Sequence, residues 1–173
     1  MEHLSTPAIS AGLRLHSLLS RIHDRNDVDR VIGQGIKHGL ITDDVDDACS
    51  RDSVERHVRR PITDSAYRVA AWFDPANVVY SERTITSAAA DDGIENLRPD
   101  RIVRHRDGGL LVIDYKSGER NDKKYCRQIG RYIAKLRVLF PDTPIAGRIW
   151  YVTHDVILDE KGELLPFEGT GIW

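Results

Sequence analysis

Apolar residues recur along the chain with two different periods. Over the first 75 or so residues they recur at helical spacing, with a broad apolar face formed by Leu13, Leu15, Leu18, Leu19 and Ile22. Start and stop signals predict four helices: over about residues 13–22 after a cap within residues 5–11, over about residues 27–37, from Thr42 to a point at or before Pro61, and from Thr63 or Asp64 through Trp72. This part of the chain is therefore expected to be mainly helical.

After residue 76 the period shortens to two, which is typical of strands. Residues 77–87 alternate and are rich in β-branched side chains, so they predict one strand. Further elements are expected in this order: a strand at Ile102–Val103, a buried strand over residues 110–115 after the turn Asp107-Gly108-Gly109, a helix over about residues 121–140 that Pro141 and Pro144 end, a strand over residues 145–153, and the start of a fifth strand at residues 156–158. A helix between two strands is a crossover, so strands 110–115 and 145–153 are expected to be parallel in an α/β domain.

Length and composition are those of an ordinary globular protein. With 173 residues, of which 40% are hydrophobic and 30% are charged, the chain is large enough to bury one core. It lacks an apolar run near the ~18 residues that a membrane span needs, and residues 1–10 show no secretory signal, so no membrane partner and a cytoplasmic location are expected. The two cysteines, Cys49 and Cys126, are expected to be free thiols, and they cannot supply the four ligands of an iron–sulfur cluster.

Positive charge is unevenly distributed along the sequence. The net charge of −2 argues against a protein that binds nucleic acid over its whole surface. Between Arg98 and Arg137, however, 12 lysines and arginines stand against 5 acidic residues. One explanation is a solvated helix face. The other is a surface that contacts nucleic acid, because the same segment contains the candidate chemistry.

Two carboxylates and one ammonium group are expected to meet in this basic segment. Asp114 and Lys116 lie two residues apart at the end of a predicted strand, so their side chains share a face. The Gly-Gly turn brings Asp100, near the start of the preceding strand, towards them. Carboxylates that bind Mg²⁺ or Mn²⁺, together with a lysine that stabilises negative charge, suit hydrolysis of a phosphodiester bond. The alternatives are a turn-capping Asp100 and a structural ion pair between Asp114 and Lys116.

These residues also resemble a known nuclease signature. Pro99-Asp100, followed after thirteen residues by Asp114-Tyr115-Lys116, is similar to the PD-(D/E)XK motif in its RecB-like form. The resemblance implies that Asp100, Asp114 and Lys116 are catalytic. It also implies a restriction-endonuclease-like core, in which helices flank a mixed central sheet, with an N-terminal helical segment.

Three further segments resemble motifs of the same family. Residues 12–19 are similar to the N-terminal helix whose histidine is a metal ligand, which gives that role to His16 beside Asp100 and Asp114. Residues 79–82 resemble the strand that carries an acidic active-site residue, here Glu82. Gln128 and Tyr132 match the Gln-x-x-x-Tyr motif and lie four apart on one helix face, where they would contact the DNA backbone or the edge of the active site.

The resemblance extends from about Gly12 to Tyr151 and is strongest to the C-terminal nuclease domain of UvrD-like helicase–nucleases of the AddA/RecB type. It implies a single domain over residues 1–173, with a helical part over residues 1–75 that carries His16 and a catalytic core over residues 76–160. It further implies an exonuclease dependent on Mg²⁺ or Mn²⁺, acting on single-stranded DNA ends in recombination and repair. The sequence has no P-loop, so a helicase motor would have to lie elsewhere in a parent protein or in a separate subunit.

The basic helix after the Asp-x-Lys strand completes the predicted site. Residues expected to contact DNA phosphates are Arg120, Lys124, Arg127 and Arg131. Two other functions stay open at this point. One is a catalytically inactive nuclease fold that serves DNA binding or protein assembly, and the other is a restriction-like or RNA-processing enzyme, because a fold does not fix its substrate.

Overall fold

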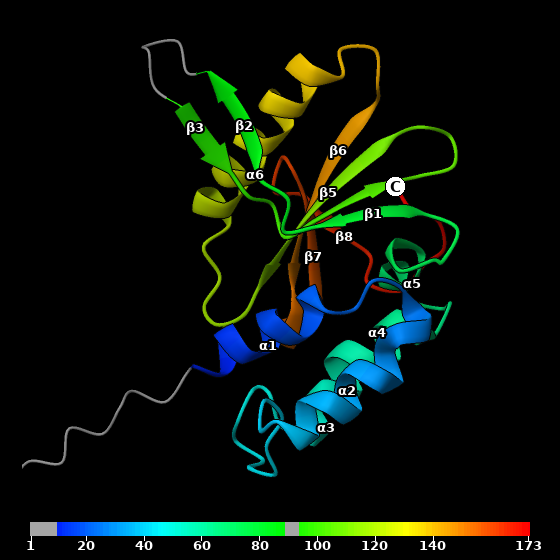
Figure 1. Cartoon of the computed structure of the whole chain (residues 1–173), viewed down its shortest axis with the longest axis vertical. Coiled ribbons are helices and arrows are strands. Elements are labelled where there is room, and N and C mark those ends of the chain that lie inside the picture. The colour runs from blue at the N-terminus through cyan, green and yellow to red at the C-terminus, as the bar shows by residue number, and fades with distance from the viewer. Residues whose placement is uncertain (1–9, 89–93) are drawn as a thin grey trace, which may run out of the picture.

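The computed structural model describes residues 10–88 and 94–173 as an α/β structure built on a mixed sheet (Figure 1). The sheet has six strands in the order β1-β4-β5-β6-β7-β8. Their bounds are β1 Val78–Ser81, β4 Arg101–Arg104, β5 Leu110–Lys116, β6 Ile145–Tyr151, β7 Val156–Asp159 and β8 Leu164–Leu165. The pair β5–β6 is parallel and the other neighbours are antiparallel, which confirms the predicted crossover.

Strand β5 lies at the centre because almost every one of its residues is buried on one face or the other. Leu111, Ile113 and Tyr115 pack into a core shared with the N-terminal helices. Leu110 and Val112 pack into a second core on the opposite face, against α6 (Asp122–Leu139). Helix α6 therefore covers one face of the sheet, and the end of β5 lies between two helical layers (Figure 1).

The N-terminal part is helical, as predicted, although some of its helix boundaries differ from the prediction. Its elements are α1 Ala11–Ser20, a 3-10 turn Arg25–Asp27, α2 Val28–Lys37, α3 Arg51–Val54, a π-helical turn Glu55–Arg59, α4 Arg60–Thr63 and α5 Arg68–Trp72. Ser10 caps α1 through a hydrogen bond from the Leu13 N–H. Residues 5–9 of the predicted cap region lie outside the described residues. Cys49 and Cys126 are free thiols, as expected.

The prediction that a third helix begins at Thr42 is wrong, because that helix begins at Arg51. Asp44 and Asp47 instead accept hydrogen bonds from the N–H groups two residues further on, at Asp46 and Cys49. Such local bonds compete with the helical hydrogen-bond pattern. The expected stop at or before Pro61 is also wrong. Pro61 lies inside the helical run, directly after the π-helical turn in which the Arg60 N–H bonds Glu55 five residues back.

The strand predicted over residues 77–87 is divided in two at Glu82, whose φ is 49°. The second part, β2 (Ile85–Ala88), pairs with β3 (Ile94–Leu97) in a separate two-stranded sheet that the sequence did not predict. Ile85 and Leu97 join the core on the α6 side, so the hairpin packs on that layer (Figure 1). No helix in the described part of the chain has the length and apolar character to cross a membrane.

Candidate active site

Asp100 lies directly before β4 and is held by two neighbouring elements. Its Oδ1 is 2.5 Å from Nε2 of His16 on α1. Its Oδ2 accepts a hydrogen bond of 2.7 Å from the backbone N–H of Tyr115 on β5. Leu15, Leu18 and Leu19 bury the inner face of α1, which leaves His16 at the edge of the helix that faces the site. The structure thus brings together an acid and a histidine that are 84 residues apart in the sequence.

Asp114 and Lys116 share one face at the end of β5, as their spacing predicted. The Lys116 ammonium lies 2.7 Å from Oδ2 of Asp114, whose side chain is 3% exposed. That oxygen is fully buried and accepts no hydrogen bond of good geometry from any described residue. Its contact with Lys116 is therefore an ion pair without a well-aligned hydrogen bond.

The pKa values of Asp100 and Asp114 are shifted in opposite directions, because the two carboxyl groups are buried close together. Burial, the charge of Asp100 and a hydrogen bond to Asp100 raise the pKa of Asp114 to about 7, against the opposing effect of Lys116. Burial also acts to raise the pKa of Asp100, but hydrogen bonds with His16, Asp114 and Tyr115 outweigh it and lower that pKa. The hydrogen bond to Asp100, opposed by burial, raises the pKa of His16. Asp114 therefore keeps its proton to a higher pH than an ordinary aspartate, whereas Asp100 ionises at a lower pH.

This donor set fits a divalent cation. Asp100 and Asp114 are buried, and the charge of Asp100 raises the pKa of Asp114, so a divalent cation between the two carboxylates would stabilise their ionised forms. Carboxylate oxygens with one imidazole nitrogen are ligands suited to Mg²⁺ or Mn²⁺. Among residues 10–88 and 94–173, no three acidic, histidine or cysteine side chains already surround a single point as metal ligands do. His16 and Lys116 are instead paired directly with Asp100 and Asp114.

Glu82 reaches the site from the end of β1. Its Oε1 is 3.5 Å from Nδ1 of His16, so the histidine lies between two carboxylates. The left-handed backbone of Glu82 is held by a hydrogen bond of 3.0 Å from its N–H to the Asp100 carbonyl. Non-glycine residues in this conformation are strained, and such strain is often found at functional sites.

Arg98 belongs to the site, although the sequence analysis assigned it no role. Its Nη2 is 2.7 Å from Oε2 of Glu82, and its Nε donates to the Glu82 carbonyl at 2.9 Å. One guanidinium therefore fixes both the side chain and the backbone of Glu82. The only signal in the sequence was the position of Arg98 directly before Pro99-Asp100.

Gln128 and Tyr132 approach from α6, as predicted, and lie on one face of that helix. The Lys116 ammonium donates to Oε1 of Gln128 at 3.0 Å, and Nε2 of Gln128 donates to the Tyr132 hydroxyl at 3.0 Å. The Tyr132 hydroxyl is 3.5 Å from the Arg98 carbonyl. These contacts therefore form a closed network that begins and ends at Arg98. We call the side chains of this network the site ring. Its side chains are those of His16, Glu82, Arg98, Asp100, Asp114, Lys116, Gln128 and Tyr132.

Two other residues that the sequence analysis did not select support this ring. Tyr125 on α6 places its ring 4.3 Å from the Lys116 ammonium, a cation–π contact that helps to hold the lysine. Arg101 is fully buried and donates to the carbonyls of Ile22 and Trp72 at 2.9 and 3.0 Å. It therefore links the ends of α1 and α5 to β4, one residue from Asp100, and fixes where His16 lies.

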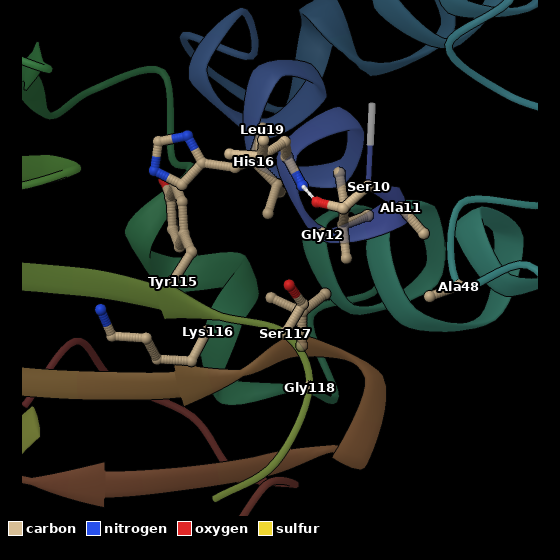
Figure 2. A pocket seen from close by; sticks show the side chains of 13 residues that line it. Ser10, Ala11, Gly12, His16, Leu19, Ala48, Tyr115, Lys116, Ser117 and Gly118 are labelled. Carbon is tan, nitrogen blue, oxygen red and sulfur yellow. Dashed lines mark hydrogen bonds between the residues drawn. The ribbon is translucent and has the colours of Figure 1, made fainter. Parts of the chain in front are cut away.

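A cavity of about 510 Å³ opens beside His16 and Lys116 (Figure 2). Figure 2 shows the first turn of α1 opposite Ser117, with His16, Tyr115 and Lys116 along the wall. A Cβ atom at Gly12 would overlap the Ser117 hydroxyl, so glycine allows α1 to approach this loop closely. A ligand in this cavity would therefore reach the site ring at His16 and Lys116.

Three of the four predicted phosphate-contacting residues lie on one face of α6. Lys124, Arg127 and Arg131 are exposed there at spacings of three and four residues, and Lys124 and Arg131 flank Gln128. Arg120 lies before the helix and is paired with Asp122 at 2.6 Å. In comparisons with known proteins, no protein-family model and no curated protein matches this chain.

Proposed function

We propose that this chain is a Mg²⁺- or Mn²⁺-dependent DNA nuclease with a RecB-like, restriction-endonuclease-like core. The observation that carries the proposal is the site ring. Its acidic, basic and amide side chains come from α1, the end of β1, the segment before β4, the end of β5 and α6, and pairwise contacts join them into one network. A structural ion pair between Asp114 and Lys116 alone would need none of the others.

Each residue of the ring has a role in this hydrolysis. Asp100, Asp114 and His16 would hold the divalent ion, which supplies an electropositive centre that polarises the phosphoryl group and lowers the pKa of an attacking water. Lys116 would orient the water or stabilise negative charge as it develops on the phosphate. Gln128 keeps the Lys116 ammonium in place through the hydrogen bond of 3.0 Å. Glu82 confines His16 between two carboxylates and so favours one orientation of the imidazole ring.

The substrate and partner follow from the resemblance and from charge. We propose exonucleolytic cleavage of single-stranded DNA ends, delivered by a UvrD-like helicase motor that is either linked covalently or a separate subunit. Lys124 and Arg131, beside Gln128, would contact phosphates of the strand. The proposal keeps the cytoplasmic location expected from the sequence, and recombination and repair of broken DNA as the process.

Cleavage of end-labelled single-stranded DNA tests the proposal. Wild-type protein with Mn²⁺ or Mg²⁺ should degrade the strand, and a chelator should stop it. Asp114→Ala and Lys116→Met should each lower the rate at least a hundredfold. Asp52→Asn is the matched control, because Asp52 is exposed and neither it nor its ion-pair partner Arg56 belongs to the site ring. DNA binding without cleavage by wild-type protein would reject the nuclease and support the inactive alternative.

A further inference from the structure

A second hollow lies on the α6 side of the sheet, away from the cavity beside His16. It has a volume of about 370 Å³ and lies between the C-terminal end of α6, strands β1 and β4, and the start of β2. We call it the α6 groove, and its lining residues are Tyr80, Arg83, Thr84, Ile85, Ile102, Arg104, Gly108, Leu110, Leu136, Leu139, Phe140 and Thr143. None of them contributes to the site ring.

Apolar surface is concentrated at this groove. Of the nine large hydrophobic side chains that are exposed among the described residues, five lie in the two short segments 78–80 and 138–140 that border it. Tyr80 and Phe140 are 39% and 46% exposed on its rim. Exposed apolar clusters of this kind mark binding surfaces rather than ordinary solvent-facing positions.

The charge of the α6 groove has one sign. Arg83 and Arg104 line it, both are exposed, and no aspartate or glutamate is among its described lining residues. An occupant that fits must therefore combine apolar or aromatic faces with negative charge. Single-stranded DNA has this combination, because its bases stack on aromatic side chains while its phosphates contact arginines.

The groove also lies on the same elements as the site ring. Leu110 and Asp114 are four residues apart on one face of β5, a separation of about 13 Å at ~3.3 Å per residue. Leu136 is one helical turn beyond Tyr132 on α6. Arg131 lies on the same helix, directly before Tyr132 and five residues before Leu136. A strand cleaved at the ring and running along α6 would reach the groove within a few nucleotides.

We propose that the α6 groove binds the part of a single-stranded DNA substrate that continues beyond the scissile phosphate. Bases stack on Tyr80 and Phe140, and Arg83 and Arg104 contact the phosphates. This inference rests on the proposed function, since a continuous strand must pass through the ring to enter the groove. It adds a binding site that none of the nuclease motifs contains.

The test is the dependence of affinity on strand length. Fluorescein-labelled oligothymidylates of four and sixteen nucleotides are titrated by fluorescence anisotropy in a chelator, so that no cleavage occurs. Wild-type protein should bind the longer strand more tightly. Tyr80→Ala and Phe140→Ala should each weaken binding of the longer strand roughly tenfold, which corresponds to about 1.4 kcal/mol. Arg104→Ser, at an exposed position, should lower the slope of log affinity against log salt by about 0.7.

Leu164→Ala and Arg56→Ser are matched controls, because both residues are exposed and lie outside the groove and the site ring. Both should bind like wild type. If the groove instead receives an acidic polypeptide, the length dependence will be the same in wild type and in every groove variant, and the proposal is overturned. Mn²⁺-dependent cleavage by wild-type protein is measured in parallel. If wild-type protein cleaves DNA but the groove variants keep the wild-type length dependence, only the groove proposal is rejected. If the groove variants alter the length dependence but wild-type protein does not cleave DNA, only the nuclease proposal is rejected.

Discussion

Replacing Asp114 with asparagine should stabilise the protein when no divalent cation is bound. Burial and the neighbouring charge of Asp100 disfavour the ionised form of Asp114, and they raise its pKa from an ordinary value of 3.8 to about 7. Asparagine keeps the size of the side chain and its ability to donate a hydrogen bond to Asp100, but it never becomes charged. Asp114→Asn therefore removes an energetic cost that only a bound cation would otherwise offset.

The magnitude follows from the pKa. Each pKa unit corresponds to about 1.36 kcal/mol, so ionised Asp114 destabilises the folded state by about 4 kcal/mol at most. The raised pKa already includes the favourable charge of Lys116, so a net gain of roughly 2–4 kcal/mol is expected when Asp114 is replaced by the neutral asparagine. For a chain of this length that corresponds to a rise in Tm of roughly 10 °C.

The stability gained by Asp114→Asn should depend on pH. Because the pKa of Asp114 is raised on folding, its stabilising contribution is complete below about pH 4 and is lost as the pH rises to about 7. The advantage of Asp114→Asn should therefore be small at pH 4.5 and large at pH 8. Thermal unfolding is followed by circular dichroism at both pH values in a chelator.

Asp100→Asn is the matched control, with the opposite expectation. Burial opposes ionisation of Asp100, but His16, Asp114 and the Tyr115 N–H outweigh it and lower the pKa of Asp100, so its carboxylate stabilises the fold at neutral pH. Asp100→Asn should lower the free energy of unfolding by about 1–3 kcal/mol. A less stable Asp114→Asn at pH 8, or an effect of equal size at pH 4.5, would refute the reasoning.

Three further outcomes follow from the site. Because Asp114 must lose its proton to bind a cation, calorimetry should show Mn²⁺ binding tighter at pH 8 than at pH 6, with proton uptake by the buffer at the lower pH; equal affinity would contradict the raised pKa of Asp114. Arg98→Ala should slow Mn²⁺-dependent DNA cleavage about tenfold but add little to Glu82→Gln, and additive losses would show that Arg98 does not act through Glu82. Gln128→Ala removes the hydrogen bond to the Lys116 ammonium, and Tyr132→Phe removes the hydroxyl that Gln128 contacts. Gln128→Ala should therefore reduce the cleavage rate more than Tyr132→Phe. The reverse order would contradict the role of Tyr132 as a support for Gln128.

Parts of the site that lie within one element could be predicted from spacing alone. Asp114 and Lys116 share a face because side chains alternate along a strand, and Gln128 and Tyr132 share a face because a helix repeats every 3.6 residues. The Gly-Gly turn likewise predicted that β4 and β5 are antiparallel neighbours. These relations depend on backbone geometry, which local sequence determines.

Other predictions failed where local and distant interactions compete. The apolar alternation of residues 77–87 is real, but the strand breaks at Glu82, where the backbone bonds Asp100 and Arg98 instead of continuing. The aspartates after Thr42 are good residues for a first helical turn, yet their side chains close tight turns with the backbone. In the first case contacts with a distant segment selected the structure, and in the second case local side-chain hydrogen bonds did.

The sequence by itself determined the change from a helical part to a strand-rich part, the parallel crossover around α6 and which residues of one element share a face. Only the tertiary structure decided that α1 brings His16 to Asp100, that Arg98 closes the ring around Glu82, and that Asp114 carries a raised pKa. The physical reason is the distance along the chain over which each effect acts. Periodicity acts over a few residues, whereas burial and charge depend on which distant segments pack against a group, and no spacing along the chain records that.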